Sequence, residues 1–505
     1  MNLHSKLSKR VLLTFLGVSL AFAAPAAAQM QQPGQDKSIP LSKVERKNRA
    51  PVSKEILQVR LPKPTEATLE NGLTVLILED HRFPTVSVTL NIAGAGALYE
   101  PADLPGLATF TALLLREGTK TRDSKKMAED VDRLGATLTA SAPFGSAATA
   151  INASGLSDNL DEWFALLVDG LQNPAFPADE LAKLKARLKV QARQVRSNPQ
   201  FLVLERFNRA VYGNHPAATI FPSEASIDAM TPELLAKWHR ERYAPQNAIL
   251  GIAGDVNTKK LLAKLKTWLG GWAKTDLKEE MPQNPTPTAA RKIFLVDRPG
   301  SVQTDVAIGN IAISRRDADY PAMMVMNRVV GGSPAARLFM NLREEKGYTY
   351  GVYSNFTALQ YRGPWQAGGN MRSEVTEGAM TEFFKEFRRI REETVPAGEL
   401  DEAKRSVVAN FALSLEQPTT LLNYAITRKI YGFPADYWDT YPAKISAITA
   451  DDVQRCAQKY INPDTIQVVA VGEAAKIKAM LEKFGTVEVY DIEGKPAALK
   501  PAATP

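Results

Sequence analysis

Histidine is the residue type most often used to bind zinc or to act as a base, and this chain has four. His81 lies in a polar turn, His215 in a Gly-Asn-His-Pro loop and His239 on a charged helix, while His4 lies in the first 28 residues. No two of them stand one helical turn apart, which is the spacing that lets two imidazoles hold one metal ion. We therefore expect surface or local structural roles for these histidines.

The sequence also gives little support for a nucleophilic cysteine or serine. Cys456, the only cysteine, is spaced at helical intervals from Val453, Ala457 and Tyr460, so a small buried side chain is favoured over a catalytic thiol. A chain with one thiol forms no internal disulfide and depends on its core. No G-x-S-x-G elbow and no His-paired nucleophile is found. An independent hydrolase is therefore disfavoured; it would require cleavage by the chain alone, insensitive to chelators.

The first 28 residues have the pattern of a cleaved secretory signal. Lys6, Lys9 and Arg10 precede an apolar stretch over residues 11–24, and Ala26-Ala27-Ala28 forms an A-x-A cleavage site. The apolar run is short for a bilayer, and no later stretch comes close to spanning length. A signal anchor is the alternative, which the alanine site disfavours. We predict an exported chain with no membrane contact after cleavage, which in a Gram-negative cell is periplasmic.

The charge of the chain argues against two classes of partner. The formal net charge is +7, and three cations but no acids lie in the first 28 residues, so +4 remains after cleavage. A charge this small and this scattered favours neither nucleic acid nor a membrane surface. The roughly 470 remaining residues suffice for two to four domains.

The mature chain contains two segments that resemble each other at an offset of about 218 residues. Pro177-Ala-Asp-Glu-Leu181 in the first segment returns as Pro396-Ala-Gly-Glu-Leu400 in the second. Each phrase follows an amphipathic helix and leads into a Lys-rich one. Each segment also begins with an alternating strand and ends with a capped helix and an apolar strand, with the caps at Thr231 and Thr449. We expect two homologous α+β halves.

These landmarks and the linker composition suggest six parts. They are a signal peptide (1–28), an N-terminal arm (29–62), a first domain (63–275), a Pro-rich linker (276–292), a second domain (293–480) and a C-terminal tail (481–505).

The order of the landmarks resembles the insulinase/pitrilysin superfamily, which includes the mitochondrial processing peptidases. The resemblance covers residues 61–472. Its most recognisable pieces are Asn71-Gly-Leu-Thr-Val75, Gly106-Leu-Ala108, Arg116-Glu-Gly-Thr119, Ser333 with Arg337-Leu338, and Leu342 to Val352. It implies two insulinase-type units, each an antiparallel sheet with helices, that together form half of a clamshell.

Active members of that family carry H-x-x-E-H on a helix directly after Gly-Leu-Ala. Two imidazoles hold zinc there, and the Glu activates water. The three positions are Thr109, Ala112 and Leu113 in this chain, and none of these side chains can replace an imidazole or a carboxylate. The family's further zinc-binding Glu follows the Pro-Ala-Asp-Glu-Leu phrase, yet residues 181–200 contain no acid. We expect a degenerate site without metal or other cofactor, and zinc only in a partner subunit.

The resemblance implies a second functional element, an Arg and a Tyr of the C-terminal half that reach the zinc site. They map to Arg343 and Tyr350, with Tyr348 as a second choice for the tyrosine. A guanidinium can bind substrate carbonyls, and a phenol can donate to a developing oxyanion. If Gly347 corresponds to Gly135, the first-half counterparts are Val131 and Leu138, so the polar pair belongs to the second half alone. The alternative is a packed aromatic edge without chemistry.

Two functions follow from this combination. The first is a non-catalytic subunit of a periplasmic zinc metallopeptidase heterodimer, which binds peptide and donates Arg343 and Tyr350 to an H-x-x-E-H-containing partner. The second is a pseudo-peptidase that serves as a binding or scaffold protein without a role in proteolysis. The first requires both side chains, whereas the second tolerates Arg343→Ala and Tyr350→Phe.

Overall fold

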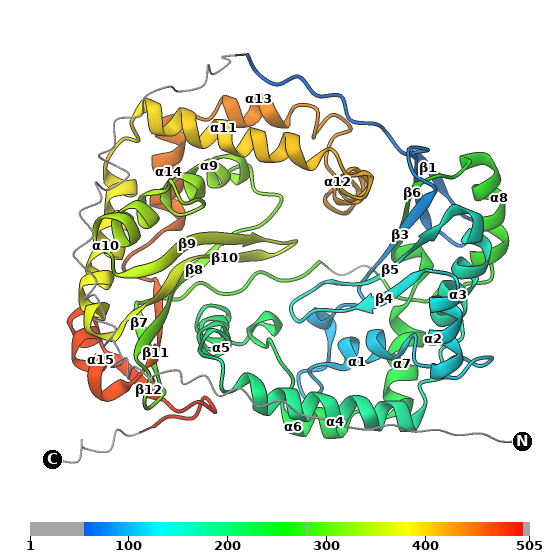
Figure 1. Cartoon of the computed structure of the whole chain (residues 1–505), viewed down its shortest axis with the longest axis horizontal. Coiled ribbons are helices and arrows are strands. Elements are labelled where there is room, and N and C mark those ends of the chain that lie inside the picture. The colour runs from blue at the N-terminus through cyan, green and yellow to red at the C-terminus, as the bar shows by residue number, and fades with distance from the viewer. Residues whose placement is uncertain (1–54, 279–280, 498–505) are drawn as a thin grey trace, which may run out of the picture. The chain divides into compact units, whose positions relative to one another are not determined.

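The computed structural model describes residues 55–278 and 281–497 of the 505 (Figure 1). The expected signal peptide (1–28), most of the expected arm (29–62) and the last eight residues of the expected tail lie outside the described residues. In the described part, no helix combines the length and the apolar character needed to cross a membrane.

The first half is built on a six-stranded sheet in the order β1-β2-β6-β3-β5-β4. Its strands are β1 (Thr65–Thr68), β2 (Thr74–Glu79), β3 (Thr85–Ala93), β4 (Thr137–Ser141), β5 (Ala148–Leu156) and β6 (Ala248–Gly254). Its helices are α1 (Leu107–Leu114), α2 (Ser124–Arg133), α3 (Leu160–Gln172), α4 (Ala178–Val195), α5 (Pro199–Tyr212), α6 (Glu224–Ala229), α7 (Pro232–Arg242) and α8 (Thr258–Leu269).

The second half repeats this plan with the sheet order β12-β7-β11-β8-β10-β9. Its strands are β7 (Lys292–Asp297), β8 (Gln303–Ile313), β9 (Thr349–Ala358), β10 (Arg362–Arg372), β11 (Gln467–Gly472) and β12 (Val487–Tyr490). Its helices are α9 (Tyr320–Val330), the π-helix η6 (Phe339–Glu345), α10 (Thr376–Glu392), α11 (Ala397–Ser414), α12 (Pro418–Tyr431), α13 (Tyr441–Ser446), α14 (Ala450–Tyr460) and α15 (Ala474–Leu481).

The two strand orders match, which confirms the predicted α+β class and the predicted duplication. Five strands of each sheet correspond, both in chain order and in their neighbours. The first sheet contributes β2, β3, β4, β5 and β6, which match β7, β8, β9, β10 and β11 of the second in that order. The sheets are mixed rather than purely antiparallel, because β2 runs parallel to β6, and β7 runs parallel to both β11 and β12. The last of these strands comes from the segment expected as a tail, where Val487 and Val489 pack against the second core.

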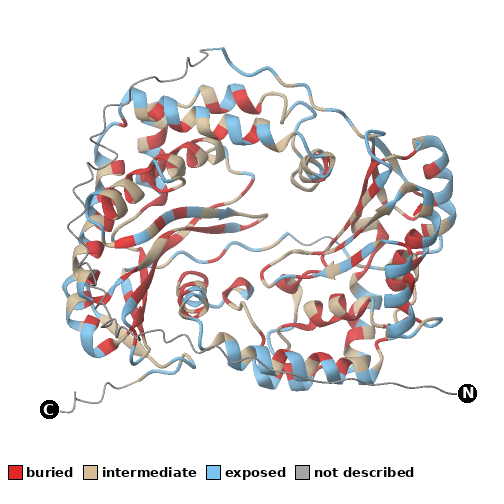
Figure 2. Cartoon of the chain, in the orientation of Figure 1, coloured by how far each residue is buried: buried red, intermediate tan, exposed pale blue. Residues whose placement is uncertain are grey.

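The sequence patterns explain the main elements. In β3 the buried positions alternate with partly exposed polar ones, so one face lies on the first core and the other faces outward. Thr231 and Thr449 accept backbone N–H groups at the starts of α7 and α14, as their spacing predicts, and Asp452 completes a capping box. Figure 2 shows buried residues along the strands and on the sides of the helices that face them.

One helix from each half packs on the sheet of the other half. Leu202, Val203 and Phe207 of α5 form a cluster with residues of β7, β8 and β11 in the second sheet. Leu422, Ala425 and Ile426 of α12 form a cluster with residues of β2 and β6 in the first sheet. The central strands β6 and β11 are therefore covered on both faces, which agrees with their continuous apolar sequences.

The exchanged helix α5 yields a stability prediction. Phe207 is fully buried, and its ring fills the space over Gly309, where an added Cβ would come within 2.8 Å of Phe207 Cζ. We expect Phe207→Ala to lower the free energy of unfolding by about 3–5 kcal/mol, measured by urea denaturation. Leu204 on the same helix is 43% exposed, so Leu204→Ala is the control and should cost below about 1 kcal/mol. Equal costs would contradict this packing.

Candidate functional site

The helix that would carry the zinc motif is α1, and its start is built around Glu100. Gly106 precedes the helix with a φ of 105°, a conformation that glycine adopts without strain. The two carboxylate oxygens of Glu100 accept the backbone N–H groups of Gly106 at 2.8 Å and Ala108 at 2.6 Å. A carboxylate of this chain thus occupies the positive end of the helix.

The side chains at the three motif positions pack in the core or form a local hydrogen bond. Thr109 donates its hydroxyl to the carbonyl oxygen of Ala142 at 2.7 Å. Ala112 is fully buried, and Leu113 packs against the first core. In residues 55–278 and 281–497, no group of three or more His, Cys, Asp or Glu side chains is arranged to hold a metal ion.

The remaining histidines and the cysteine make local contacts. His81 is exposed, and its Nδ1 lies 2.6 Å from Asp255 Oδ1, a hydrogen bond that raises the pKa of His81. His239 is partly buried and donates to a backbone carbonyl at 2.8 Å, and the loss of solvent around its ring lowers its pKa to about 4. His215 accepts a backbone N–H group at the start of the short helix that follows it. Cys456 is fully buried, which raises the pKa of its thiol to about 12.

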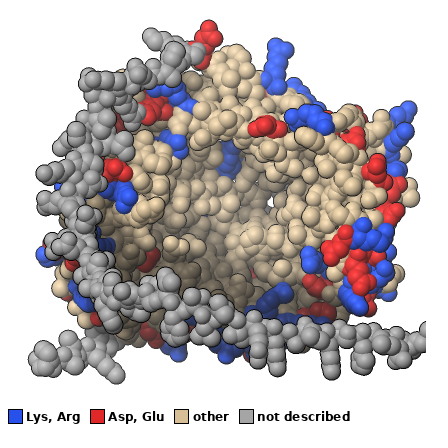
Figure 3. Space-filling model, in the orientation of Figure 1, with Lys and Arg blue, Asp and Glu red and all other residues tan. Residues whose placement is uncertain are grey.

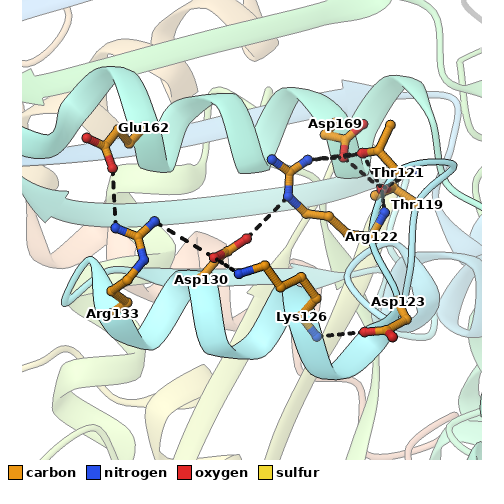
Figure 4. Close-up of polar contacts among 9 residues, drawn as sticks. All are labelled: Thr119, Thr121, Arg122, Asp123, Lys126, Asp130, Arg133, Glu162 and Asp169. Carbon is orange, nitrogen blue, oxygen red and sulfur yellow. Dashed lines mark hydrogen bonds and ion pairs between the residues drawn. The ribbon is translucent and has the colours of Figure 1, made fainter.

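The segment after α1 is held by a polar network around Asp169 of α3 (Figure 4). Asp169 Oδ2 accepts from Thr119 Oγ1 at 2.7 Å, Thr121 Oγ1 at 2.9 Å and Arg122 Nη1 at 2.8 Å. Burial acts to raise the pKa of Asp169, but these hydrogen bonds and one from Asn173 outweigh it and lower the pKa. The Arg-Glu-Gly-Thr piece of the family resemblance therefore has a structural role here.

Arg343 and Tyr350 are brought together at the edge of the second sheet. Arg343 lies on η6, a π-helical stretch of a kind often found at functional sites, and Tyr350 lies on the edge strand β9. The Arg343 guanidinium carbon stands 4.7 Å from the centre of the Tyr350 ring. The Arg343 side chain is 39% exposed, and Tyr350 is 83% exposed. Both polar groups can therefore reach a bound molecule.

The structure places the two candidate tyrosines in different surroundings. Tyr348 packs against the second core, and its hydroxyl lies over Gly378 of α10, where an added Cβ would be 3.0 Å away. Tyr350 instead projects from the sheet and is among the most exposed large side chains of the described residues. Tyr350 is thus the tyrosine with a free hydroxyl at the surface.

The first-half counterparts of this pair are apolar and packed. Gly135 and Gly347 have left-handed φ values of 58° and 63°, and at both an added Cβ would meet open space, so the two turns correspond. At the matching positions, Leu138 is buried and Val131 packs against the first core. The exposed polar pair is therefore a property of the second half, as the alignment of the two glycines predicts.

A cleft of about 460 Å³ lies between α5 and the strands β8, β9 and β10. Gly351, Gly368 and Gly369 are among its lining residues, which also include Tyr353 and Asp305. Burial raises the pKa of Asp305. Sequence reasoning missed this cleft because α5 comes from the other half, and the glycine-rich strand residues carry no motif.

In the view of Figure 3, Lys, Arg, Asp and Glu of the described residues gather toward the periphery, and the surface near the centre is largely uncharged. The outward face of the first sheet carries uncharged polar side chains. Thr89 Oγ1 donates to Asn152 Oδ1 at 3.0 Å, and Thr137 Oγ1 lies 2.8 Å from Ser154 Oγ. Neutral hydroxyl and amide groups of this kind suit contacts with a polar backbone.

Comparisons with known proteins agree with the architecture. The family model for insulinase (peptidase family M16) matches residues 74–221, and that for the peptidase M16 inactive domain matches residues 229–407. An uncharacterized zinc protease of Bacillus subtilis is 24% identical over 364 residues, 70% of this chain and 85% of that protein. One from Rickettsia felis is 24% identical over 413 residues, 79% of this chain and 96% of that protein.

Solved structures show the same fold. A peptidase M16 inactive domain from Pseudomonas fluorescens has a TM-score of 0.74 and 26% identity, covering 81% of this chain and 98% of that one. A protease from Helicobacter pylori has a TM-score of 0.74 and 21% identity, covering 81% of this chain and all of that one.

The position of Glu100 gives a prediction of pH dependence. Burial raises the pKa of Glu100 from 4.5 to about 7, although the backbone N–H donors of α1 act in the opposite direction. Between these values the folded state binds more protons than the unfolded state, so this group makes unfolding easier as pH rises. The unfolding free energy of the wild type relative to Glu100→Gln should fall by about 1.4 kcal/mol per pH unit in that window. A difference independent of pH would contradict the assignment.

The network of Figure 4 gives a second prediction. Asp169→Ala leaves two hydroxyls and a guanidinium without their shared acceptor, so we expect a loss of about 2–3 kcal/mol in unfolding free energy by urea denaturation. Glu162→Ala is the matched control, because Glu162 only forms an exposed 3.5 Å ion pair with Arg133 and should cost below about 0.5 kcal/mol. Similar losses in both variants would show that the network does not hold this segment.

The family models together span both halves, and the fold, the duplication and the order of motifs agree with them. The chain belongs to the insulinase (M16) family of peptidases, as a member with Thr109, Ala112 and Leu113 in place of the H-x-x-E-H zinc motif.

Proposed function

We propose that the chain is the zinc-less, non-catalytic subunit of a periplasmic metallopeptidase heterodimer. It binds peptide and donates Arg343 and Tyr350 to the zinc site of a homologous H-x-x-E-H-containing partner. The observation that carries the proposal is the exposed pair itself, a guanidinium 4.7 Å from the ring of a tyrosine that is 83% exposed.

The contrast between the halves supports a division of labour. Packing has replaced the zinc ligands at α1, whereas the second half presents an arginine and a tyrosine outward. A purely structural pair would be expected to bury the phenol against its neighbours, as Tyr348 does. An exposed phenol beside a guanidinium is suited to hold a peptide carbonyl and to donate to an oxyanion that another subunit generates.

Peptide binding is supported by the backbone around the pair. β9 is an edge strand, and an extended peptide can pair with such an edge. Ser354 lies outside the stretch open to pairing, because its N–H donates to the Gly331 carbonyl and its carbonyl accepts from Asn327. The cleft of about 460 Å³ beside it has a glycine-lined strand surface that lets another backbone approach closely. Substrate would therefore lie along β9, with its carbonyls within reach of Arg343.

The test is reconstitution with any H-x-x-E-H protein that co-purifies with this chain. We expect Arg343→Ala to lower the kcat/KM of the mixture by roughly 10²-fold, because one transition-state donor is lost, and Tyr350→Phe to lower it in the same direction. Initial rates on a fluorogenic peptide measure the effect. Arg372→Ala is the control, since Arg372 is an exposed arginine of the same sheet that pairs only with Glu374 among the described residues.

Unchanged thermal unfolding of each variant confirms that the rate reports on the site. If both site variants keep full activity in an active mixture, the pair has no role in proteolysis. A chain that binds its partner but supports no cleavage at all would favour the scaffold function instead.

A further inference from the structure

Arg315 is a buried cation without an acidic partner. It lies between β8 and α9, is only 7% exposed, and forms no ion pair with any residue in the ranges 55–278 and 281–497. Its guanidinium stands over aromatic rings, 3.8 Å from the centre of Tyr320 and 4.8 Å from that of Phe433, and Nη1 donates to Tyr437 Oη at 2.8 Å. Rings and one neutral hydroxyl offset only part of the cost of burying this charge.

A cavity of about 340 Å³ lies directly beside this guanidinium. Its walls come from α9, the strand β9, α11, α12 and α13, all in the second half. Most of the walls are aromatic or aliphatic, contributed by Tyr320, Phe356, Phe411, Tyr424, Trp438 and Tyr441. A cavity of this size and composition suits a small organic ligand with an apolar body.

A second arginine lines the same cavity. Arg328 of α9 donates to the carbonyl oxygen of Gly332 at 2.5 Å and to the Ser406 hydroxyl, both neutral acceptors. Among the lining residues there is no Asp or Glu, whereas Asn410 and Ser414 add neutral hydrogen-bonding groups. Two cations in an apolar cavity without an acid make a site that favours an anion.

We propose that this cavity binds a small organic carboxylate whose remaining atoms are apolar, with the carboxylate at one of the two guanidinium groups, Arg315 or Arg328, and the apolar part between the aromatic rings. A fully hydrated inorganic anion would leave the rings without a partner, which is why a carboxylate on a hydrocarbon body fits better than phosphate. The ligand is either a free acid or the C-terminal carboxylate of a peptide that ends in an apolar residue. The site is separate from Arg343 and Tyr350 and does not depend on the function proposed for them.

The test is isothermal titration of the mature chain with 3-phenylpropanoate and, as its neutral counterpart, 3-phenylpropanamide. We expect one saturable site for the acid and binding at least about tenfold weaker for the amide, because a charge-assisted hydrogen bond is lost. Short peptides that end in Phe, with a free or an amidated C-terminus, distinguish the two sources. Binding of the free-ended peptide identifies a peptide terminus, and binding of 3-phenylpropanoate without it identifies a free acid.

Variants locate the site. Arg315→Gln or Arg328→Gln, whichever removes the guanidinium that holds the carboxylate, should weaken binding of the acid at least about tenfold. Arg206→Gln is the control, since Arg206 also stacks on rings, 3.5 Å from the centre of Tyr490, but lies in α5 away from the cavity. No binding to the wild type, equal binding of acid and amide, equal binding of inorganic phosphate, or an affinity unchanged in both Arg315→Gln and Arg328→Gln would each overturn the proposal.

Discussion

The burial of the central strands on both faces is the constraint on which the rest of the structure depends. β6 is apolar throughout and β11 is apolar after Gln467, so each needs cover on two sides, and the chain supplies it by packing α12 on the first sheet and α5 on the second. Neither half could bury its own sheet in this way alone. The exchanged helices cover only part of each sheet, so the strands beyond β3 and β8 keep a partly open face. The cleft next to Tyr353 and the exposed edge strand β9 are direct consequences of this partial cover.

Within this duplicated frame, equivalent positions have taken opposite roles. Around the turns at Gly135 and Gly347 the backbone has the same left-handed conformation, yet one turn is followed by the buried Leu138 and the other by the exposed Tyr350. At α1 the opposite has happened, because Ala112 and Leu113 pack where a metal-binding member would place polar ligands. In this chain Ala112 and Leu113 are packed at the zinc-motif positions, whereas Arg343 and Tyr350 form an exposed polar pair.

Much of the fold could be predicted from the sequence, because its signals are local. Alternation in β3, the caps at Thr231 and Thr449 and the repeated Pro-Ala-x-Glu-Leu phrase each report on a few neighbouring residues, and the repetition of all of them established the two halves. The mixed sheets and β12 were missed, because strand direction and a late four-residue strand leave little trace in sequence. The exchange of α5 and α12 was missed for a different reason: an apolar stripe shows that a helix is buried, but not against which sheet.

Only part of the candidate site could be predicted from the sequence. Arg343 and Tyr350 were reached through the family resemblance, and the choice between Tyr348 and Tyr350 required their burial. Asp305, Arg315 and Arg328 carried no sequence signal, because their significance lies in cavities assembled from distant segments and in acids that are absent from the walls. The central claim is that this chain completes a zinc site it does not itself possess. The most direct measurement is peptidase activity and bound zinc of the purified mature chain, alone and titrated with its H-x-x-E-H partner. We expect no bound zinc and no cleavage by the chain alone, and activity in the mixture that saturates at one chain per partner. Zinc-dependent cleavage by the chain alone would contradict the proposed function.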